Sequence, residues 1–148
     1  MIELVTVIAI IGALAVFALP RLDPSGFRRY AFRQEMLSGL RYAQKTAMAS
    51  GCDVAVQLDA GADAFSLFYR AGGTATDCGA AGNAFTDPVS DPAAAGAFSR
   101  SAGSGANLQT SGTVVFDGFG NHASGPTTIA FAQAPAIDVD GATGYIHE

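Results

Sequence analysis

Few residues in this chain have both the type and the setting that catalysis requires. The two histidines are His122, in the loop-like stretch Gly120-Asn121-His122, and His147, next to the last residue. A hydrolase triad needs a base held against a nucleophile and an orienting acid. No serine here stands in the setting of a nucleophile elbow. The sequence therefore predicts that the protein is not an enzyme and has no catalytic residues.

Motifs for cofactors and metals are equally weak. The glycines of 118–120 do not complete a dinucleotide-binding fingerprint, and no helical pattern follows them. Asp138-x-Asp140-Gly141 is similar to part of a calcium loop, but its spacing would put Ala136 and His147 where acids are needed. Two cysteines are too few for an all-cysteine zinc site. We expect no cofactor and no metal, with a non-standard calcium site as a minor alternative.

The charge is divided between two parts of the chain. Lys and Arg number 8 against 13 Asp and Glu, a net charge of −5. Residues 21–50 carry a net +4, whereas residues 51–148 carry a net −8. The simpler interpretation is two solvated surfaces of opposite sign. The alternative is that basic stems and acidic bodies of neighbouring copies attract one another.

An apolar run opens the chain. Met1 to Leu19 contains only Glu3 and Thr6 as polar residues, and a helix of this length spans about 28 Å, close to the core of a bilayer. The run is apolar on every face, which argues against a buried helix of a soluble protein. It lacks the basic start and the small-residue cleavage site of a signal peptide. We therefore expect a retained, single-pass membrane anchor. An acid in such a run is either interfacial or functional.

This N-terminal run resembles that of type IV pilins and type II secretion pseudopilins. The resemblance lies in Ile2-Glu3-Leu4-Val5-Thr6-Val7-Ile8-Ala9-Ile10-Ile11-Gly12 and in Pro20. It implies a leader removed by a prepilin peptidase and an N-methylated first residue, and it places both upstream of Met1. It also implies that Glu3 pairs with the N-terminal amine of a neighbouring subunit and fixes the axial register. The resemblance also implies that Gly12 corresponds to the glycine within the N-terminal helix of these families, and Pro20 to the proline that kinks it.

An amphipathic stem helix is predicted for residues 23–50. Asp23-Pro24 is an N-cap followed by proline at the first helical position, and Gly51 is a suitable residue to end the helix. Most of the basic residues, including Arg33, are expected off the apolar stripe. The stripe that should pack on a sheet consists of Phe27, Tyr30, Ala31, Met36, Leu37, Leu40, Ala43, Ala47 and Met48.

The end of the stem resembles one particular group within these families. Residues 40–51, followed by Val54-Ala55-Val56, are similar to the GspH/FimT-like minor pseudopilins, and most of all to the MshC-type minor pilins of MSHA pili. The resemblance covers residues 2–58 well. In the remainder it is limited mainly to the pattern of the last strands.

The body is predicted to be a β-rich head. Alternating or apolar stretches separated by turn residues indicate strands at 52–58, 64–70, 113–117, 127–132, 136–139 and 143–147. Between them, the Ala/Gly-rich excursion 71–112 has only Phe85, Val89, Phe98 and Leu108 as anchors. We interpret it as a lightly anchored surface loop or as a contact surface for another pilin.

The fold class that follows is α+β. A long N-terminal hydrophobic helix (1–22) and an amphipathic stem (23–50) precede an antiparallel head (51–148), and the stem packs on the sheet of that head.

A disulfide between Cys52 and Cys78 is expected in the head. The first hairpin turns near Gly61, which sets Cys52 beside Arg70, so a short return of the chain could bring Cys78 close. The periplasmic location implied by the resemblance favours oxidation. Two free thiols are the main alternative, and a cysteine-bound metal is a minor one.

The expected function is that of a structural subunit. The resemblance implies a minor pilin or pseudopilin in the bacterial inner membrane, with a periplasmic head, that primes or joins a type IV, MSHA-like pilus. Its partners would be other pilins, the prepilin peptidase and the inner-membrane assembly platform. The alternatives are a GspH-like pseudopilin of type II secretion and a membrane-tethered periplasmic binding module that does not polymerise. No nucleic-acid partner is expected, because the end 143–148 has no Lys or Arg and the body is acidic.

Overall fold

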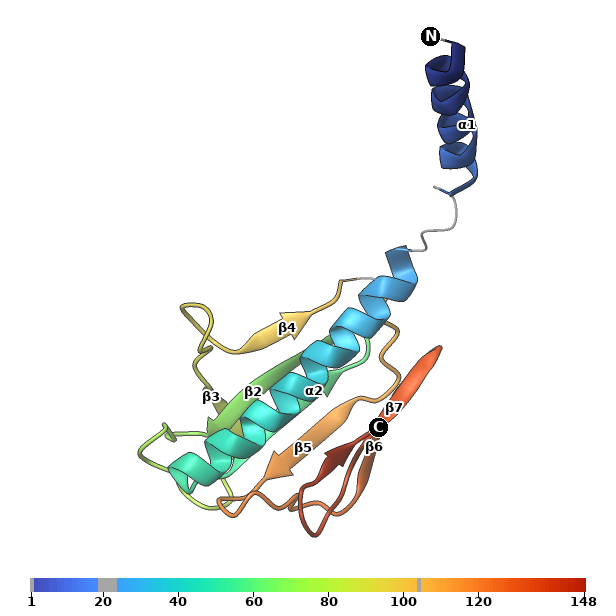
Figure 1. Ribbon diagram of the computed structural model, residues 1–148. Helices are drawn as coiled ribbons and strands as arrows, with labels where there is room; N and C mark the ends of the chain where they lie inside the picture. The colour runs from blue at the N-terminus through green and yellow to red at the C-terminus, as the bar shows by residue number, and fades with distance from the viewer. Residues whose placement is uncertain (1, 19–23, 104) are drawn as a thin grey trace.

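The computed structural model describes residues 2–18, 24–103 and 105–148, in which two helices precede a series of short strands (Figure 1). Helix α1 covers Ile2–Ala18 and helix α2 covers Pro24–Ser50. The strands are β1 (Val54–Asp59), β2 (Ala64–Arg70), β3 (Phe85–Pro88), β4 (Ser99–Ser101), β5 (Gly112–Phe116), β6 (Thr127–Phe131), β7 (Ala134–Val139) and β8 (Ile146–His147). The Asp23 N-cap lies outside the described residues.

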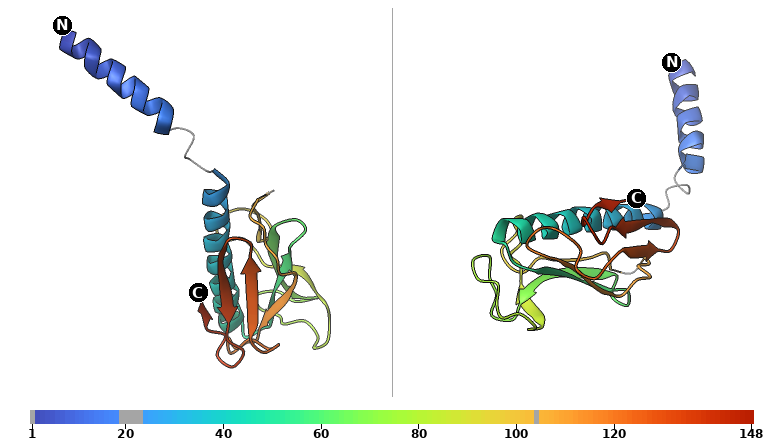
Figure 2. Two further views of the ribbon diagram at one scale, coloured as in Figure 1. Left: turned by 90° about the vertical axis from the view of Figure 1, so that its right-hand side faces the viewer. Right: turned by 90° about the horizontal axis from the view of Figure 1, so that it is seen from below.

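The strands form two antiparallel sheets. One has the order β3-β2-β1-β5, with β4 also paired to β2, and the other has the order β6-β7-β8. In the first sheet Val56 of β1 lies opposite Leu67 of β2 and Val114 of β5. Helix α2 runs along the sheets and covers their inner side (Figure 2). The prediction of an α+β fold with a helix packed on antiparallel sheets is therefore confirmed.

The packing of α2 explains why this segment is helical in the fold. Its buried face meets inward-facing side chains of β1, β2 and β5. β2 alternates between buried and half-buried positions as a half-buried strand requires, whereas residues 54–56 of the central strand β1 are all buried. Gly51 has a φ of 69°, a left-handed conformation that ends the helix where the sequence predicts. The large side chains of α2 on the buried face are Phe32, Met36, Leu37 and Leu40, with the small Ala43 and Ala47 following.

Part of the predicted stripe is wrong. Phe27 is 77% exposed, and Tyr30 and Met48 are exposed as well, whereas Arg33 is buried. At about 100° per residue, Phe27 lies on the opposite side of the helix from the centre of the buried face, while position 33 falls within that face. Spacings of three and four, counted without this angular drift, assigned residues of two faces to one stripe.

Gly39 shows how closely the helix approaches the sheet. A Cβ at this position would meet the ring of Phe65 on β2, with Cζ at 2.8 Å. The Phe65 ring is buried and itself lies against Phe32 and Phe98, with ring centroids 5.9 and 6.1 Å away. The ring therefore has little room to move, and glycine lets the helix sit at this distance.

We expect Gly39→Ala to destabilise the head, although alanine favours a helix. The gain of about 1 kcal/mol in helix propensity is opposed by an overpacking cost of about 1–3 kcal/mol, so the net change should be a loss. Urea unfolding followed by circular dichroism measures it. Ser38→Ala, at the exposed neighbouring position, should change the free energy of unfolding by less than about 0.5 kcal/mol. A Gly39→Ala variant more stable than the wild type would contradict this packing argument.

The excursion 71–112 is more ordered than predicted. It contributes β3 and β4, both of which pair with β2, and an isolated bridge joins Ser90 to Ala97 between them. Of the four predicted anchors, Val89, Phe98 and Leu108 are buried, whereas Phe85 is partly exposed with the guanidinium of Arg70 over its ring. The prediction of a lightly anchored loop is therefore wrong for 85–101, which extends the sheet.

The remaining strand predictions hold to within a few residues, with one exception. Strands β1, β2, β5, β6 and β7 correspond to the predicted segments, whereas 143–147 contains only the short β8.

The turn before β8 is held by a side chain of α2. The side-chain amide of Gln44 donates to the carbonyls of Gly120 and Gly144, at 2.9 and 3.0 Å. One side chain of the stem thereby joins the turn after β5 to the turn before β8.

Candidate functional site

Helix α1 carries the residues for which the sequence predicts a role in assembly. Its side chains from Ile2 to Ala13 are exposed, and Figure 1 shows the helix apart from the head. The large apolar ones are exposed by 53 to 80% and occupy every side of the helix: Ile2, Leu4, Val5, Val7, Ile8, Ile10 and Ile11. A helix of this kind needs an apolar environment on all sides, because the hydrophobic effect opposes its exposure to water.

The length of α1 is 17 residues. In the described ranges, no helix is both long and apolar enough to cross a membrane.

Glu3 is the acid within α1. Its backbone carbonyl accepts a hydrogen bond from the hydroxyl of Thr6 at 2.8 Å, and its side chain is exposed. Within the described residues the Glu3 carboxylate has no ion-pair partner. A Cβ at Gly12 would meet nothing within 4 Å, and the neighbouring positions of α1 are exposed as well. Pro20, the predicted kink, lies outside the described residues.

The disulfide predicted between Cys52 and Cys78 is present. The two Cα atoms are 4.8 Å apart and the residues are separated by 26 positions in the chain. Cys52 follows the end of α2 and is buried, and Cys78 ends a small turn in which it bridges to Gly73. The register Val54↔Tyr69 of the first hairpin brings the chain after β2 back to the end of α2, as expected. The alternative of free thiols is wrong.

Most acidic side chains of the head have local partners. Asp138 accepts from the hydroxyl of Thr128, and Asp53 and Asp91 pair with Arg70 and Arg100. Six others accept hydrogen bonds from backbone N–H groups. Four do so within their own turns: Asp59 (61 and 62), Asp77 (79), Asp117 (119 and 121) and Asp140 (142 and 143). Two do so across the chain: Asp63 (105 and 108) and Asp87 (72). The excess of acids in residues 51–148 thus has a structural explanation within the head, in its turns and in contacts between its segments.

The Asp138-x-Asp140-Gly141 stretch is one of these capped turns. Hydrogen bonds from the backbone and hydroxyl of Thr143 and from the backbone of Ala142 lower the pKa of the Asp140 carboxyl. No group of three or more metal-ligating side chains is found in the ranges 2–18, 24–103 and 105–148.

His122 connects β5 to the start of β6 through hydrogen bonds of its ring. It is buried, with Nδ1 at 3.0 Å from the carbonyl oxygen of Val115 and Nε2 at 2.9 Å from the hydroxyl of Thr127. If Nδ1 carries the proton, it donates to Val115 and Nε2 accepts from Thr127, so both ring nitrogens are satisfied. No carboxylate orients the ring in these contacts. This arrangement joins β5 to the start of β6.

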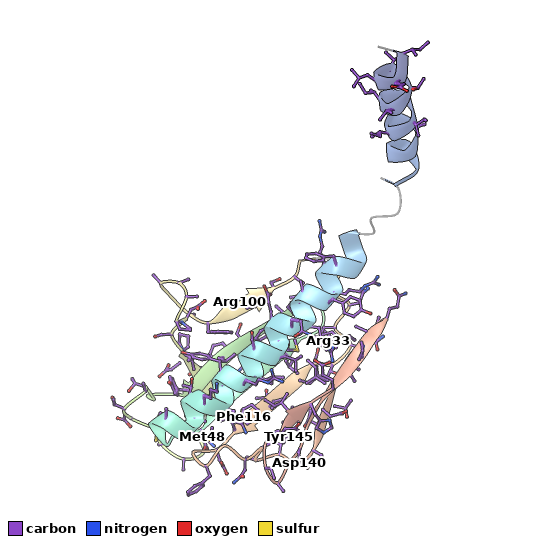
Figure 3. The ribbon with its side chains drawn as sticks, viewed as in Figure 1. Arg33, Met48, Arg100, Phe116, Asp140 and Tyr145 are labelled. Carbon is purple, nitrogen blue, oxygen red and sulfur yellow. A yellow bond between two sulfur atoms is a disulfide. The ribbon has the colours of Figure 1, made fainter. Side chains whose placement is uncertain are left out.

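Arg33 is the buried charge that the sequence analysis missed. Its residue is 2% exposed, and Nε donates to the carbonyl of Pro135 at 2.8 Å while Nη2 lies 3.4 Å from that of Ala136. Nη1 pairs with Glu148 at 3.0 Å. Figure 3 shows Arg33 between α2 and the last strands. Its helical position was one signal in the sequence, because position 33 precedes Met36, Leu37 and Leu40 on the same face. The partners that make burial of its charge favourable, Pro135 and Glu148, could not be identified from that position.

We expect the contribution of Glu148 to stability to depend on pH. The hydrogen bond from Arg33 lowers the pKa of the Glu148 carboxyl below its ordinary value of 4.5. The fold therefore favours the ionised form, so this stabilisation is present above 4.5 and is lost as the pH falls through the lowered pKa. Urea midpoints of the wild type and Glu148→Gln should differ at neutral pH and converge in acid.

A matched control for this measurement is Glu35→Gln, which neutralises an exposed acid on α2, the helix that carries Arg33. Its difference from the wild type should be smaller at neutral pH than that of Glu148→Gln. A gap between the wild type and Glu148→Gln that widens in acid would contradict the assignment.

Comparison of the chain with family models, with curated proteins and with solved structures finds no match. The features of the chain that bear on its function are therefore the exposed apolar helix α1, Glu3 and the packing of the stem on the head.

Proposed function

We propose that the protein is a minor pilin or pseudopilin, a structural subunit that joins or primes a filament assembled at the inner membrane. The observation that carries this proposal is helix α1, whose large apolar side chains are exposed on every side. Such a surface is far larger than the scattered exposed apolar residues of ordinary monomers. Side-by-side packing of α1 with equivalent helices would cover all of its faces at once.

The head supports the same proposal. Helix α2 is joined to both sheets through its buried face and through Gln44, so α2 and the head share one core. The helix precedes the head along the chain, and α1 precedes it in turn. This order lets the apolar helices of several subunits gather while their heads remain outside and present surfaces to neighbours.

Membrane insertion before assembly is part of the proposal. It depends on the whole run from Met1 to Leu19, whose length as a helix is close to that of a bilayer core, rather than on the described part of α1 alone. The head would then lie in the periplasm. The disulfide between Cys52 and Cys78 is consistent with such an oxidising compartment.

Fractionation of cells tests this function. An epitope-tagged chain, expressed in its own host, should be found in the membrane fraction and in filaments sheared from the cell surface or overproduced as pseudopili. Crosslinking through α1 should capture other pilins. A chain that stays in the membrane as a single subunit, while the same cells make normal filaments, would overturn the proposal and favour a membrane-tethered binding module. Crosslinks to pilus or to secretion subunits would separate those two systems.

A further inference from the structure

A cavity of about 310 Å³ lies beside the stem, away from α1. It is bounded by α2 on one side, by β2 and the end of β3 on another, and by the disulfide-closed turn after β2. The lining residues on α2 are Tyr42 and Thr46, those on the strands are Tyr69 and Pro88, and Val89 and Ser90 follow β3. Gly73, Thr74 and Ala75 complete the wall. Its volume is within the range of small-ligand sites.

Tyr69 is the unusual residue of this cavity. It is only 5% exposed, yet its hydroxyl makes no hydrogen bond to any residue that the structure describes. Burial, together with the nearby Tyr42, raises the pKa of the Tyr69 phenol, so it stays a neutral donor and acceptor. Among the described residues this hydroxyl is not one of the fully buried polar atoms that lack a partner, so it reaches solvent-accessible surface and is free to bond to a molecule in the cavity. A ligand in the cavity would supply a partner.

The other lining groups define the chemistry of such a ligand. None of the lining side chains is charged, so nothing selects an anion or a cation. Hydroxyls of Tyr42 and Thr46 stand on successive turns of α2, and Tyr42 donates to the carbonyl of Ser90 at 3.2 Å. Hydroxyl groups both donate and accept, and they match ligand hydroxyls best. The exposed Pro88, with the buried Val89 next to it, offers an apolar surface for C–H groups.

The wall formed by 73–75 is held in place independently of any ligand. Gly73 bridges to Cys78, and the backbone N–H of Thr74 donates to the carbonyl of Asp77 at 2.6 Å. The disulfide joins this turn to the end of α2. The cavity is therefore preformed, which lowers the entropic cost of binding.

We propose that this cavity binds an uncharged polyhydroxylated ligand of the size of one sugar ring, with Tyr69 donating a hydrogen bond to a ligand hydroxyl. The apolar face of the ring would lie against Val89 and Pro88. This inference does not depend on the proposed filament function, because the cavity belongs to the head and can be tested by binding alone.

The tyrosines themselves are suitable probes. The chain has four tyrosines and no tryptophan. The full chain, labelled with carbon-13 in its tyrosine rings, is kept in an amine-oxide detergent, because a glycoside detergent would compete. It is titrated separately with the methyl glycosides of glucose, galactose, mannose and N-acetylglucosamine. At least one should shift the ring signals of Tyr42 and Tyr69 in a saturable manner, leaving those of Tyr30 and Tyr145 unchanged.

Conservative variants identify the contact. Tyr69→Phe removes only the hydroxyl and should weaken binding about fivefold, the usual effect of one neutral hydrogen bond. Tyr145→Phe, at an exposed tyrosine stacked on His147, should bind as the wild type does. The absence of a saturable shift with all four glycosides would overturn the proposal, as would equal binding by Tyr69→Phe. Equal or tighter binding of cyclohexanol or glucuronate would also overturn it, since the cavity would then select apolar or charged ligands.

Discussion

Replacing Cys52 and Cys78 together by serine should lower the free energy of unfolding of the head by about 3.5 kcal/mol. The bridge closes a segment of 26 residues, and in the chain-entropy model a crosslink of that span restricts the unfolded chain by this amount. The crosslink joins the end of α2 to the turn after β2, so it holds together elements that pair along the whole first hairpin. The loss should exceed that of Gly39→Ala.

Urea unfolding of the full chain in detergent, followed by the circular dichroism of the strands, measures this loss. Wild-type protein kept in dithiothreitol is the matched control, because it lacks the bridge but keeps both sulfur atoms. Its midpoint should coincide with that of the double serine variant. If the double variant lost less than about 1 kcal/mol, the bridge would not restrict the unfolded chain as the model requires. A reduced wild type that remained as stable as the oxidised one would lead to the same conclusion.

The bridge was predictable because it follows from local regularities. Alternation in 52–58 and 64–70 defined a hairpin, the turn near Gly61 fixed its register, and the register set the distance from Cys52 to the chain after Arg70. Gly51 was predictable for a similar reason, since the end of a helix needs a residue that tolerates a positive φ. Both features follow from patterns within a few neighbouring residues, namely strand alternation and a glycine at a helix end, and such patterns can be read from the sequence alone.

Features that depend on contacts far along the chain were not predictable. Arg33 is a charged residue on a helix, and only the position of Pro135 and Glu148, more than a hundred residues later, makes its burial favourable. Strands β3 and β4 are short and rich in polar residues, so their sequences do not alternate clearly. They are strands because β2 offers an unpaired edge to each of them. The free hydroxyl of Tyr69 is likewise visible only once its surroundings are known.

Glu3→Gln should abolish entry into filaments while leaving the level of the subunit in the membrane unchanged. A carboxylate among packed apolar helices is poorly solvated and costly unless a cation pairs with it. The described residues of its own chain give Glu3 no such partner, and we propose that in a filament the partner comes from another subunit. The N-terminal amine of the neighbouring chain is the proposed partner. This pairing would favour one axial offset between neighbouring helices, which is a register function.

The glutamine variant separates register from insertion because it removes the burial cost together with the attraction. A single subunit should therefore insert as well as the wild type, whereas its crosslinks to other pilins and its amount in sheared filaments should fall to background. Glu35→Gln is the matched control: it makes the same chemical change on the exposed side of α2 and should leave both quantities unchanged. Normal crosslinking and a normal filament count with Glu3→Gln would instead identify Glu3 as an interfacial residue at the end of the helix. In that case the exposed apolar faces of α1, and not its carboxylate, would have to determine how neighbouring subunits align.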